Sequence, residues 1–260
     1  MQKENQEKDT LLLEKRFIEL SRTAYQRDII TYTDFLNLNE QNILHTLPKN
    51  KLYSDYVFFG GYGLAERQMA AFIPDALYLR GENEIGYPFE AVRIFPSGRK
   101  FAEELSHRDY LGAILNLGID RSKTGDIIRY NGDAVVFVSS DLAGFLCENL
   151  TRIRHTAVMA ECIPLPGTEY SPQFEEIKGT VASVRLDSLL ALAFSASRTK
   201  LSGLIEGAKV FVNGKLITSN GYQPKEGDII SVRGMGKFRY AESGSRSKKN
   251  RIYVSIQKYI

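Results

Sequence analysis

The sequence contains few of the residues that support redox or metal chemistry. Only two of its 260 residues are cysteines, which is too few for a disulfide framework or a four-cysteine zinc site. Cys147 and Cys162 both stand among apolar neighbours, a setting typical of reduced cysteines in a hydrophobic core. The three histidines, His45, His107 and His155, are too scattered to predict a ligand set. We therefore expect neither a metal nor a cofactor.

Long apolar runs and a secretory leader are also missing. No run approaches the roughly 18 residues that a transmembrane helix needs. The first ten residues are polar and charged and lead into no signal-peptide core. These features predict a cytoplasmic protein without membrane insertion.

Charge is distributed unevenly along the chain. The whole sequence carries a net charge of +3, which by itself indicates little. Residues 181–260 contain 14 Lys and Arg against five Asp and Glu, a net of +9, whereas residues 1–180 have a net of −6. A basic block beside an acidic remainder predicts separate modules, one of which has a polyanionic partner.

Residues 1–80 predict an α-rich module that contains a β-hairpin. The periodicity of apolar residues predicts helices at 9–27 and 33–47 and strands at 56–59 and 67–73. A glycine-containing and charged stretch at 81–88 is expected to act as a linker.

Residues 81–166 predict a second module with the element order β-α-β-β-α-β. The expected strands are 89–95, 125–130, 133–139 and 157–163, and the expected helices are 105–117 and 142–153. Asn131-Gly132 predicts a tight hairpin turn, and Asp141 is expected to cap the second helix. This order is ferredoxin-like and is shared by RNA-recognition modules. Phe137 could stack on a base, although a core position is the favoured interpretation.

Residues 181–260 predict two short helices followed by strands. The expected elements are a strand at 179–184, helices at 185–194 and 198–206, and strands at 209–212, 215–217 and 229–233. Ser197 is expected to cap the second helix and Gly207 to follow its C-cap. Asn213-Gly214 predicts another tight turn.

Two cations occupy an unusual place in this region. Arg198 and Lys200 fall in the first turn of the second predicted helix, where positive charge opposes the helix dipole. A helix N-terminus with added cations suits a phosphate group. The alternative interpretation, two solvated surface charges, remains open.

Several motifs between residues 181 and 238 resemble the S4 RNA-binding module, in the order that this module has them. They are Arg185-Leu-Asp187, Ser197-Arg-Thr-Lys200, Ile205-x-Gly207-x-Lys209-Val-x-Val212-Asn213-Gly214-Lys215, Gly227-Asp228-x-Ile230 and Val232-Arg233-Gly234. The resemblance implies RNA-facing residues at Arg185, Ser197, Arg198, Lys200, Lys209, Asn213 and Lys215. Arg233, Lys237 and Arg239 are expected to extend the same face.

Motifs upstream of this module extend the resemblance to almost the whole chain. Gly60-Gly-Tyr62, Ala65-Glu-Arg67, His107-Arg-Asp-Tyr-Leu-Gly-Ala113, Leu117-Gly-Ile-x-Arg121 and Gly125-Asp-Ile127 are similar to those of the YlmH-type S4 proteins. That bacterial family is linked to cell-division gene clusters and to the ribosome. The resemblance implies binding to rRNA or tRNA on the large ribosomal subunit, and a role in rescue or quality control of stalled ribosomes.

Signatures of enzymes that carry S4 modules are missing. The single Arg-Leu-Asp tripeptide, Arg185-Leu186-Asp187, belongs to the S4 module and leaves no second copy for a pseudouridine synthase. Gly60–Gly63 lacks the spacing of a nucleotide-type turn. His107-Arg108-Asp109 is similar to a kinase catalytic loop, but Ile114 stands where the metal-binding Asn should fall. We expect His107 and Asp109 to cap a helix, with Arg108 either exposed or bound to phosphate, and we expect no catalytic residues.

The cations near the C-terminus lie in a stretch rich in glycine and serine. They are Arg246, Lys248, Lys249 and Arg251, and the composition of the stretch, Ser243-Gly-Ser-Arg-Ser, predicts a mobile loop. Such a loop is either simply solvated or becomes ordered on RNA.

These observations predict an α+β protein with three small modules, at 1–80, 81–166 and 181–260. We expect a non-enzymatic protein that binds structured RNA. The alternative is an interaction protein of the division machinery that uses the acidic N-terminal module, with RNA binding secondary. An unrecognised RNA-modifying enzyme remains a weaker alternative.

Overall fold

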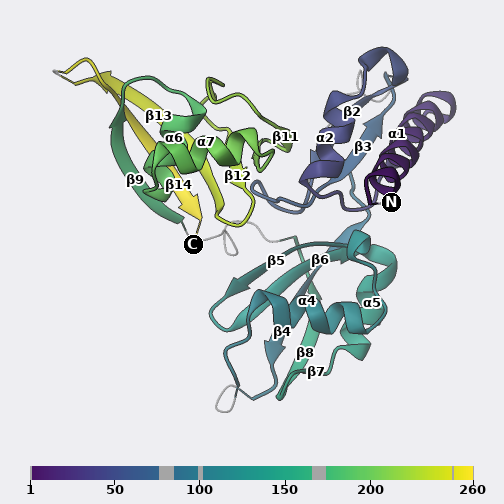
Figure 1. Ribbon diagram of the computed structural model, residues 1–260. Coiled ribbons are helices and arrows are strands. Elements are labelled where there is room, and N and C mark those ends of the chain that lie inside the picture. The colour runs from purple at the N-terminus through teal and green to yellow at the C-terminus, as the bar shows by residue number, and fades with distance from the viewer. Residues whose placement is uncertain (1, 76–84, 99–101, 166–173, 248, 260) are drawn as a thin grey trace. The chain divides into compact units, whose positions relative to one another are not determined.

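The computed structural model describes residues 2–75, 85–98, 102–165, 174–247 and 249–259 (Figure 1). The described chain combines helices with antiparallel sheets, so the fold is α+β, as predicted. The chain divides into two compact units, Met1–Ser171 and Pro172–Ile260. The first unit contains both upstream modules that the sequence predicts, and the second contains the S4-like module.

The N-terminal module packs two helices against a small antiparallel sheet. The sheet has the strand order β1-β3-β2. The elements are α1 (Gln2–Arg27), β1 (Thr31–Tyr32), α2 (Leu38–Thr46), a 3-10 turn at Lys49–Lys51, β2 (Asp55–Phe59) and β3 (Met69–Ile73). Phe17 and Ala24 of α1, Leu44 of α2 and Phe72 of β3 are almost completely buried in its core.

The second helix of this module begins later than predicted, at Leu38 rather than at residue 33. Asn37 caps it, because its side chain accepts hydrogen bonds from the backbone N–H groups of Asn39 and Glu40. The Glu40 carboxylate accepts in return from the Asn37 N–H, at 2.6 Å, which completes a capping box. Residues 33–37 are not helical, and Leu36 among them forms an isolated β-bridge with Gln68. β1, which precedes them, pairs with β3.

The middle module has the predicted β-α-β-β-α-β order. Its elements are β4 (Phe89–Pro96), α4 (His107–Asn116), a 3-10 turn at Arg121–Lys123, β5 (Thr124–Tyr130), β6 (Asp133–Ser139), α5 (Ser140–Asn149), β7 (Arg152–Ile153) and β8 (Thr156–Ile163). The sheet order is β5-β6-β4-β8-β7, and the pairings are antiparallel. This is the ferredoxin-like arrangement with a short extra edge strand. Asn131 and Gly132 both have positive φ, as the predicted tight turn requires.

Both helix starts predicted in this module are corrected. Ser106 caps α4, and Asp109 completes its capping box, whereas His107 is the first helical residue. The hydrogen bonds from Ser106 hold the pKa of Asp109 below its usual range. Asp141 does not cap α5, because the chain passes from β6 directly into the helix and Asp141 falls in the first turn. α5 also ends at Asn149, and Ile153 belongs to β7.

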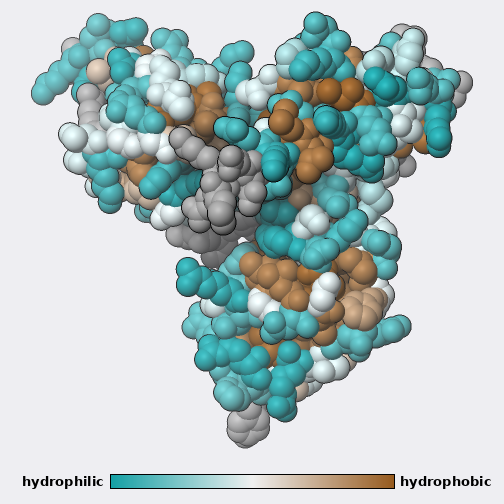
Figure 2. Space-filling view, turned by 45° about the vertical axis from the view of Figure 1, so that its right-hand side comes forward, coloured by the Kyte–Doolittle hydropathy of each residue, from teal (hydrophilic) through white to brown (hydrophobic). Residues whose placement is uncertain are grey.

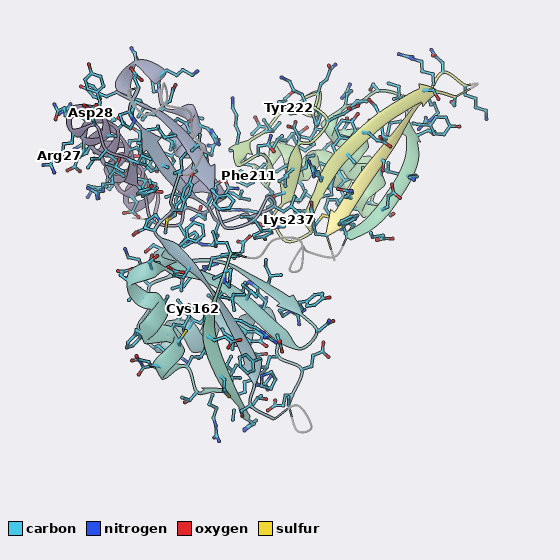
Figure 3. All side chains as sticks on the ribbon, turned by 180° about the vertical axis from the view of Figure 1, so that it is seen from behind. Arg27, Asp28, Cys162, Phe211, Tyr222 and Lys237 are labelled. Carbon is cyan, nitrogen blue, oxygen red and sulfur yellow. The ribbon has the colours of Figure 1, made fainter. Side chains whose placement is uncertain are left out.

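The two cysteines are not both buried, in contrast to the prediction. Cys162 is exposed on β8 (Figure 3), and Cys147 on α5 is half-buried. Their Sγ atoms lie 3.7 Å apart, and both thiols are free. Burial is the largest cause that raises the pKa of Cys147, to about 11. This thiol is therefore protonated and a weak nucleophile near neutral pH.

The N-terminal module covers part of one face of the middle sheet. Phe137 of β6 is completely buried in a cluster that also contains Phe35, Met69 and Phe89. Its ring stacks on Tyr62, with the ring centroids 5.7 Å apart. The core position favoured for Phe137 is thus confirmed, and its ring is not available to stack on a base.

Polar side chains from the family-like motifs meet at the same junction. The Asp126 carboxylate accepts from the Tyr62 hydroxyl at 2.7 Å and from the backbone N–H groups of Glu66 and Arg67. The Arg67 guanidinium donates to the carbonyl oxygens of Phe35, Arg121 and Thr124, at 2.8–2.9 Å. These bonds link the two upstream modules into one unit.

The second unit is a six-stranded antiparallel sheet with two helices on one face (Figure 1). Its elements are β9 (Phe174–Val181), α6 (Leu186–Phe194), α7 (Arg198–Glu206), β10 (Val210–Val212), β11 (Lys215–Leu216), β12 (Ile229–Val232), β13 (Gly236–Arg246) and β14 (Ile252–Tyr259). The sheet order is β11-β10-β12-β13-β14-β9. Its core, formed by residues such as Leu190, Leu201, Ile230 and Phe238, lies between helices and sheet.

Two features of this unit differ from the sequence-based expectation. The strand predicted at 179–184 is instead β9, which starts earlier and ends earlier, at Phe174 and Val181, and pairs along its full length with β14. The stretch expected to be a mobile loop instead belongs to the hairpin of β13 and β14. Arg251 is fixed there by donating to the hydroxyl and the carbonyl oxygen of Thr180. Lys248 lies outside the described residues.

The end of α7 explains why glycine occupies position 207. Gly207 is the C-cap itself, with φ of −79°, and the left-handed residue is Ala208, with φ of 56°. A Cβ atom on Gly207 would lie 2.7 Å from the carbonyl oxygen of Gly203. Lack of space, rather than backbone handedness, therefore favours glycine at this position.

Candidate nucleic-acid interface

The N-terminus of α7 has the features of an anion site. Ser197 caps it as predicted, with its Oγ accepting from the backbone N–H of Lys200 at 3.4 Å. The first turn contains no acidic residue, and the Lys200 side chain is exposed. The Arg198 side chain lies outside the described part of the structure. A cation beside free helix N–H groups favours the binding of a phosphate.

Arg185, at the N-cap position of α6, is partly engaged within the protein. Its guanidinium forks onto the Asp187 carboxylate, with N–O distances of 3.1 and 3.4 Å. The side chain is still 43% exposed, so its remaining N–H groups can reach a ligand. Arg185 therefore has a structural role within the Arg-Leu-Asp motif in addition to its predicted contact with RNA.

The hairpin between β10 and β11 presents Lys215 and is fixed by Asn213. Asn213 and Gly214 both have positive φ, which confirms the predicted turn. The Asn213 side chain donates to Asp228 Oδ1 at 2.8 Å and accepts from the Ile229 N–H at 2.9 Å. Lys215 is exposed on the edge strand. Asn213 thus anchors the turn that presents this lysine.

We expect Asn213→Ala to destabilise the second unit by about 1–2 kcal/mol, because it removes two hydrogen bonds and leaves a non-glycine residue at positive φ. Thermal unfolding would measure this loss, and RNA affinity measured per folded molecule would change little. Asn213→Gly, which tolerates the backbone conformation, should recover part of the stability. A large loss of affinity with unchanged stability would instead identify Asn213 as a direct RNA contact.

Three further predicted residues lie on the opposite face of the sheet. Phe238 and Tyr240 point into the core under the helices, and successive strand residues point to opposite faces. Lys237 and Arg239 therefore lie on the face away from α6 and α7. The Arg233 guanidinium lies on that side too, 5.6 Å from the ring centroid of Phe211. The expectation that these three cations extend the helix face is corrected by the register of β12 and β13.

Aromatic rings accompany the cations on this second face (Figure 3). The Lys237 ammonium lies 5.8 Å from the ring centroid of Tyr259, and Phe211 lies under Arg233. Burial raises the pKa of Tyr259 to about 12, so its hydroxyl stays neutral. Phe211 is only 1% exposed, so it supports Arg233 but cannot itself stack on a base. Lys237 beside the partly exposed ring of Tyr259 suits an unpaired base as well as a phosphate. Sequence reasoning missed Tyr259, because only the register shows which strand residues share a face.

Lys209 directly precedes β10 and lies beside Arg233. Its carbonyl oxygen accepts from the Arg233 N–H at 2.9 Å, and its side chain is exposed. The structure therefore separates two sets of the predicted residues that it describes, with Lys209 next to the second. The helix-and-hairpin set is Arg185, Ser197, Lys200, Asn213 and Lys215, and the sheet set is Arg233, Lys237 and Arg239.

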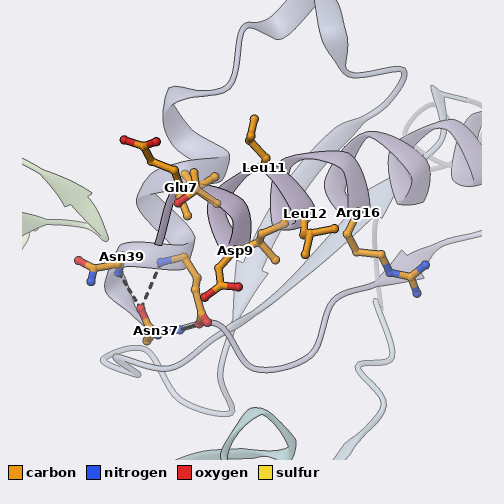
Figure 4. Close-up of a pocket in the computed structure, with 11 residues that line it drawn as sticks. Glu7, Asp9, Leu11, Leu12, Arg16, Asn37 and Asn39 are labelled. Atoms are coloured by element: carbon orange, nitrogen blue, oxygen red, sulfur yellow. Dashed lines mark hydrogen bonds between the residues drawn. The ribbon is translucent and has the colours of Figure 1, made fainter. Parts of the chain in front are cut away.

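A groove in the N-terminal module has different chemistry (Figure 4). It has a volume of about 1020 Å³ and lies between α1 and α2. Leu11 and Leu12 line it and are 55% and 65% exposed. Figure 2 shows that hydrophobic areas on the drawn face of the molecule are surrounded by hydrophilic side chains. The carboxylates of Glu7, Asp9 and Glu40 also line the groove and would repel phosphate, so it does not suit RNA.

Within the described ranges, no group of three His, Cys, Asp or Glu residues could hold a metal ion. No helix in that part of the chain is long and apolar enough to cross a membrane.

Comparison with known proteins identifies the family. Residues 91–166 match the family described as "Putative RNA-binding domain in YlmH", and residues 184–230 match the S4 domain. The chain is 31% identical over 245 residues to the "Ribosome-associated protein quality control protein P2" of Bacillus subtilis. The matched region covers 93% of this chain and 92% of that relative. The chain belongs to the YlmH family.

A solved structure carries the same family name. It is described as "Cell division protein ylmH from Streptococcus pneumoniae" and is 21% identical, covering 61% of this chain and 92% of that one, with a TM-score of 0.47. A similarity of this size does not place individual residues. The S4 match in this YlmH-family chain spans α6, α7 and the β10–β11 hairpin, where the helix-and-hairpin set of cations lies.

Proposed function

We propose that this chain binds structured RNA, rRNA or tRNA, and acts on the large ribosomal subunit in rescue or quality control of stalled ribosomes. The observation that carries the proposal is the set of exposed cations at the α7 N-terminus and on the β10–β11 hairpin, within an S4 domain. The relative from Bacillus subtilis, similar over almost its whole length, is named for ribosome-associated quality control. We place this activity in the cytoplasm and propose that it involves no catalytic step.

The electrostatics of the second unit support this proposal. The basic excess of 181–260 adds long-range attraction to the local phosphate contacts. If five to seven phosphates are neutralised, log K should fall with log salt at a slope of about −3.5 to −6.

The proposal is tested by sedimenting the full chain with ribosomal subunits on density gradients. We expect it to migrate with large subunits at low salt and to be released as salt rises. The variant Lys200→Gln/Lys209→Gln/Lys215→Gln, which loses three exposed cations, should remain at the top of the gradient. Undiminished cosedimentation of this variant, or migration of the wild-type chain without subunits, would contradict the proposal.

A further inference from the structure

The middle module cannot bind RNA in the manner of most RNA-recognition modules. Those modules stack bases on aromatic side chains of the exposed sheet face. Here the corresponding face holds Phe137, which is completely buried together with Phe35 and Phe89. Arg93 on the same sheet pairs with Asp133 at 2.6 Å. A contact with RNA by this module therefore requires another surface.

A cleft of about 480 Å³ lies elsewhere on this module, between α4 and the segment that leads into and out of β7. Arg108 lines it from α4, and Arg152 and Arg154 line it from the opposite wall. Asn116, Asn149 and Thr151 add polar groups to the same cleft. Three arginines and one acidic residue, Asp109, line the cleft, so its lining is basic overall.

Two of the three arginines of the cleft are not neutralised by a described residue. The side chains of Arg108 and Arg152 are exposed and make no ion pair or hydrogen bond with any described residue. Arg154 has only loose contacts, 3.6 Å from Asp109 and 3.9 Å from Glu103. The Asp109 carboxylate is already engaged with Ser106, at 2.6 and 2.8 Å. The cleft therefore retains positive charge for a ligand.

Two features of α4 are unfavourable for the helix but suit an anionic ligand. Arg108 stands in the first turn, where a cation opposes the helix dipole. Gly112 lies in the helix interior, where glycine costs about 0.5–1 kcal/mol relative to alanine. A Cβ atom on Gly112 would meet nothing within 4 Å, so packing within the described structure does not require glycine there. Its missing side chain leaves room for a ligand backbone to approach the helix.

We propose that this cleft, formed by α4 and the residues around β7, is a second RNA-binding site that grips the phosphodiester backbone through Arg108, Arg152 and Arg154. Guanidinium groups fork onto phosphate oxygens, and side-chain amides add hydrogen bonds to phosphate or sugar. RNA is favoured over an acidic protein because residues 91–166 match a domain family described as RNA-binding. The inference shares with the proposed function the premise that the chain binds RNA, but it depends on different residues.

The test uses the full chain with Arg108→Gln/Arg152→Gln, since these residues have no partner among the described residues and their loss should leave the melting temperature unchanged. Bulk tRNA and 23S rRNA serve as probes. We expect the affinity to fall about 20-fold at 0.15 M salt and the salt slope to become shallower by about 1.4–1.8. Arg16→Gln/Arg27→Gln, which removes the same charge from α1, should change the affinity less than twofold. Ultraviolet crosslinks should map to 108–116 and 149–154 in the wild-type chain.

Separate outcomes distinguish this site from the S4 interface. If the cleft variant binds both RNAs like the wild-type chain while Lys200→Gln/Lys209→Gln/Lys215→Gln loses affinity, the second site is wrong and the S4 proposal stands. If only the cleft variant loses affinity, the cleft is supported and the S4 proposal fails. Binding of polyglutamate that depends on Arg108 and Arg152, with RNA affinity unchanged, would assign the cleft to an acidic protein and overturn the inference.

Discussion

Replacing Arg67 by alanine should destabilise the first unit by about 3–5 kcal/mol. The Arg67 guanidinium donates to three backbone carbonyl groups, from Phe35, Arg121 and Thr124. Partial burial of the Arg67 guanidinium lowers its pKa. Its removal would leave these carbonyl groups without their donor at the junction of the two upstream modules. Urea unfolding followed by circular dichroism would measure the change.

Two controls make this result specific. Arg67→Lys should recover only part of the stability, because an ammonium group cannot reach three acceptors in the planar geometry of a guanidinium. Arg16→Ala should cost less than about 0.5 kcal/mol, because Arg16 is 59% exposed and its ion pair among the described residues is the exposed one with Glu19. The second unit has its own core, so its unfolding transition should not move. Equal stability of Arg67→Ala and the wild-type chain would show that the junction does not depend on this residue.

Removing Lys200, Lys209 and Lys215 together should weaken binding to bulk tRNA and 23S rRNA by about 100-fold at 0.15 M salt. Each lysine that contacts a phosphate releases counterions on binding, so the slope of log K against log salt should become shallower by about 2–2.7. All three side chains are exposed, and replacement by glutamine should leave the melting temperature unchanged. Fluorescence anisotropy at several salt concentrations would give both quantities.

The sheet face provides the comparison for this measurement. Arg233→Gln/Lys237→Gln/Arg239→Gln removes the same charge from the other side of the sheet. If RNA contacts the helix-and-hairpin set alone, this variant should lose affinity only through the long-range field, by much less than 100-fold. Lys8→Gln/Lys15→Gln/Arg27→Gln on α1 controls for the change in net charge. An affinity that stayed at the wild-type value after loss of Lys200, Lys209 and Lys215 would exclude these three lysines from the interface.

Much of the local structure followed from the sequence because it depends on neighbouring residues. Asn131-Gly132 and Asn213-Gly214 form the predicted turns, since asparagine and glycine tolerate positive φ better than other residues. Ser197 caps α7 because its hydroxyl can reach an N–H three residues further on. The predicted β-α-β-β-α-β order is also observed. Where several residues compete for a cap, as at Ser106 and Asp141, the sequence indicated the helix but not its first residue.

The S4 motifs likewise identified which residues belong to the candidate interface, but not which face of the sheet each residue lies on. Lys237 and Arg239 lie on the face away from the helices because the register of β13 places Phe238 in the core. A shift by one residue would exchange the two faces. Strand pairing that spans many residues sets this register, so composition and short motifs could not predict it.

The sequence by itself determined the family, the β-α-β-β-α-β order of the middle module, the tight turns and the basic character of the C-terminal module. The tertiary structure decided that Phe137 is covered, that Arg67 joins two modules, and that Arg108 faces Arg152 and Arg154 across one cleft. The reason is physical. Turns and caps depend on backbone preferences and hydrogen bonds within a few residues, whereas burial and shared surfaces depend on the packing of elements distant in the chain.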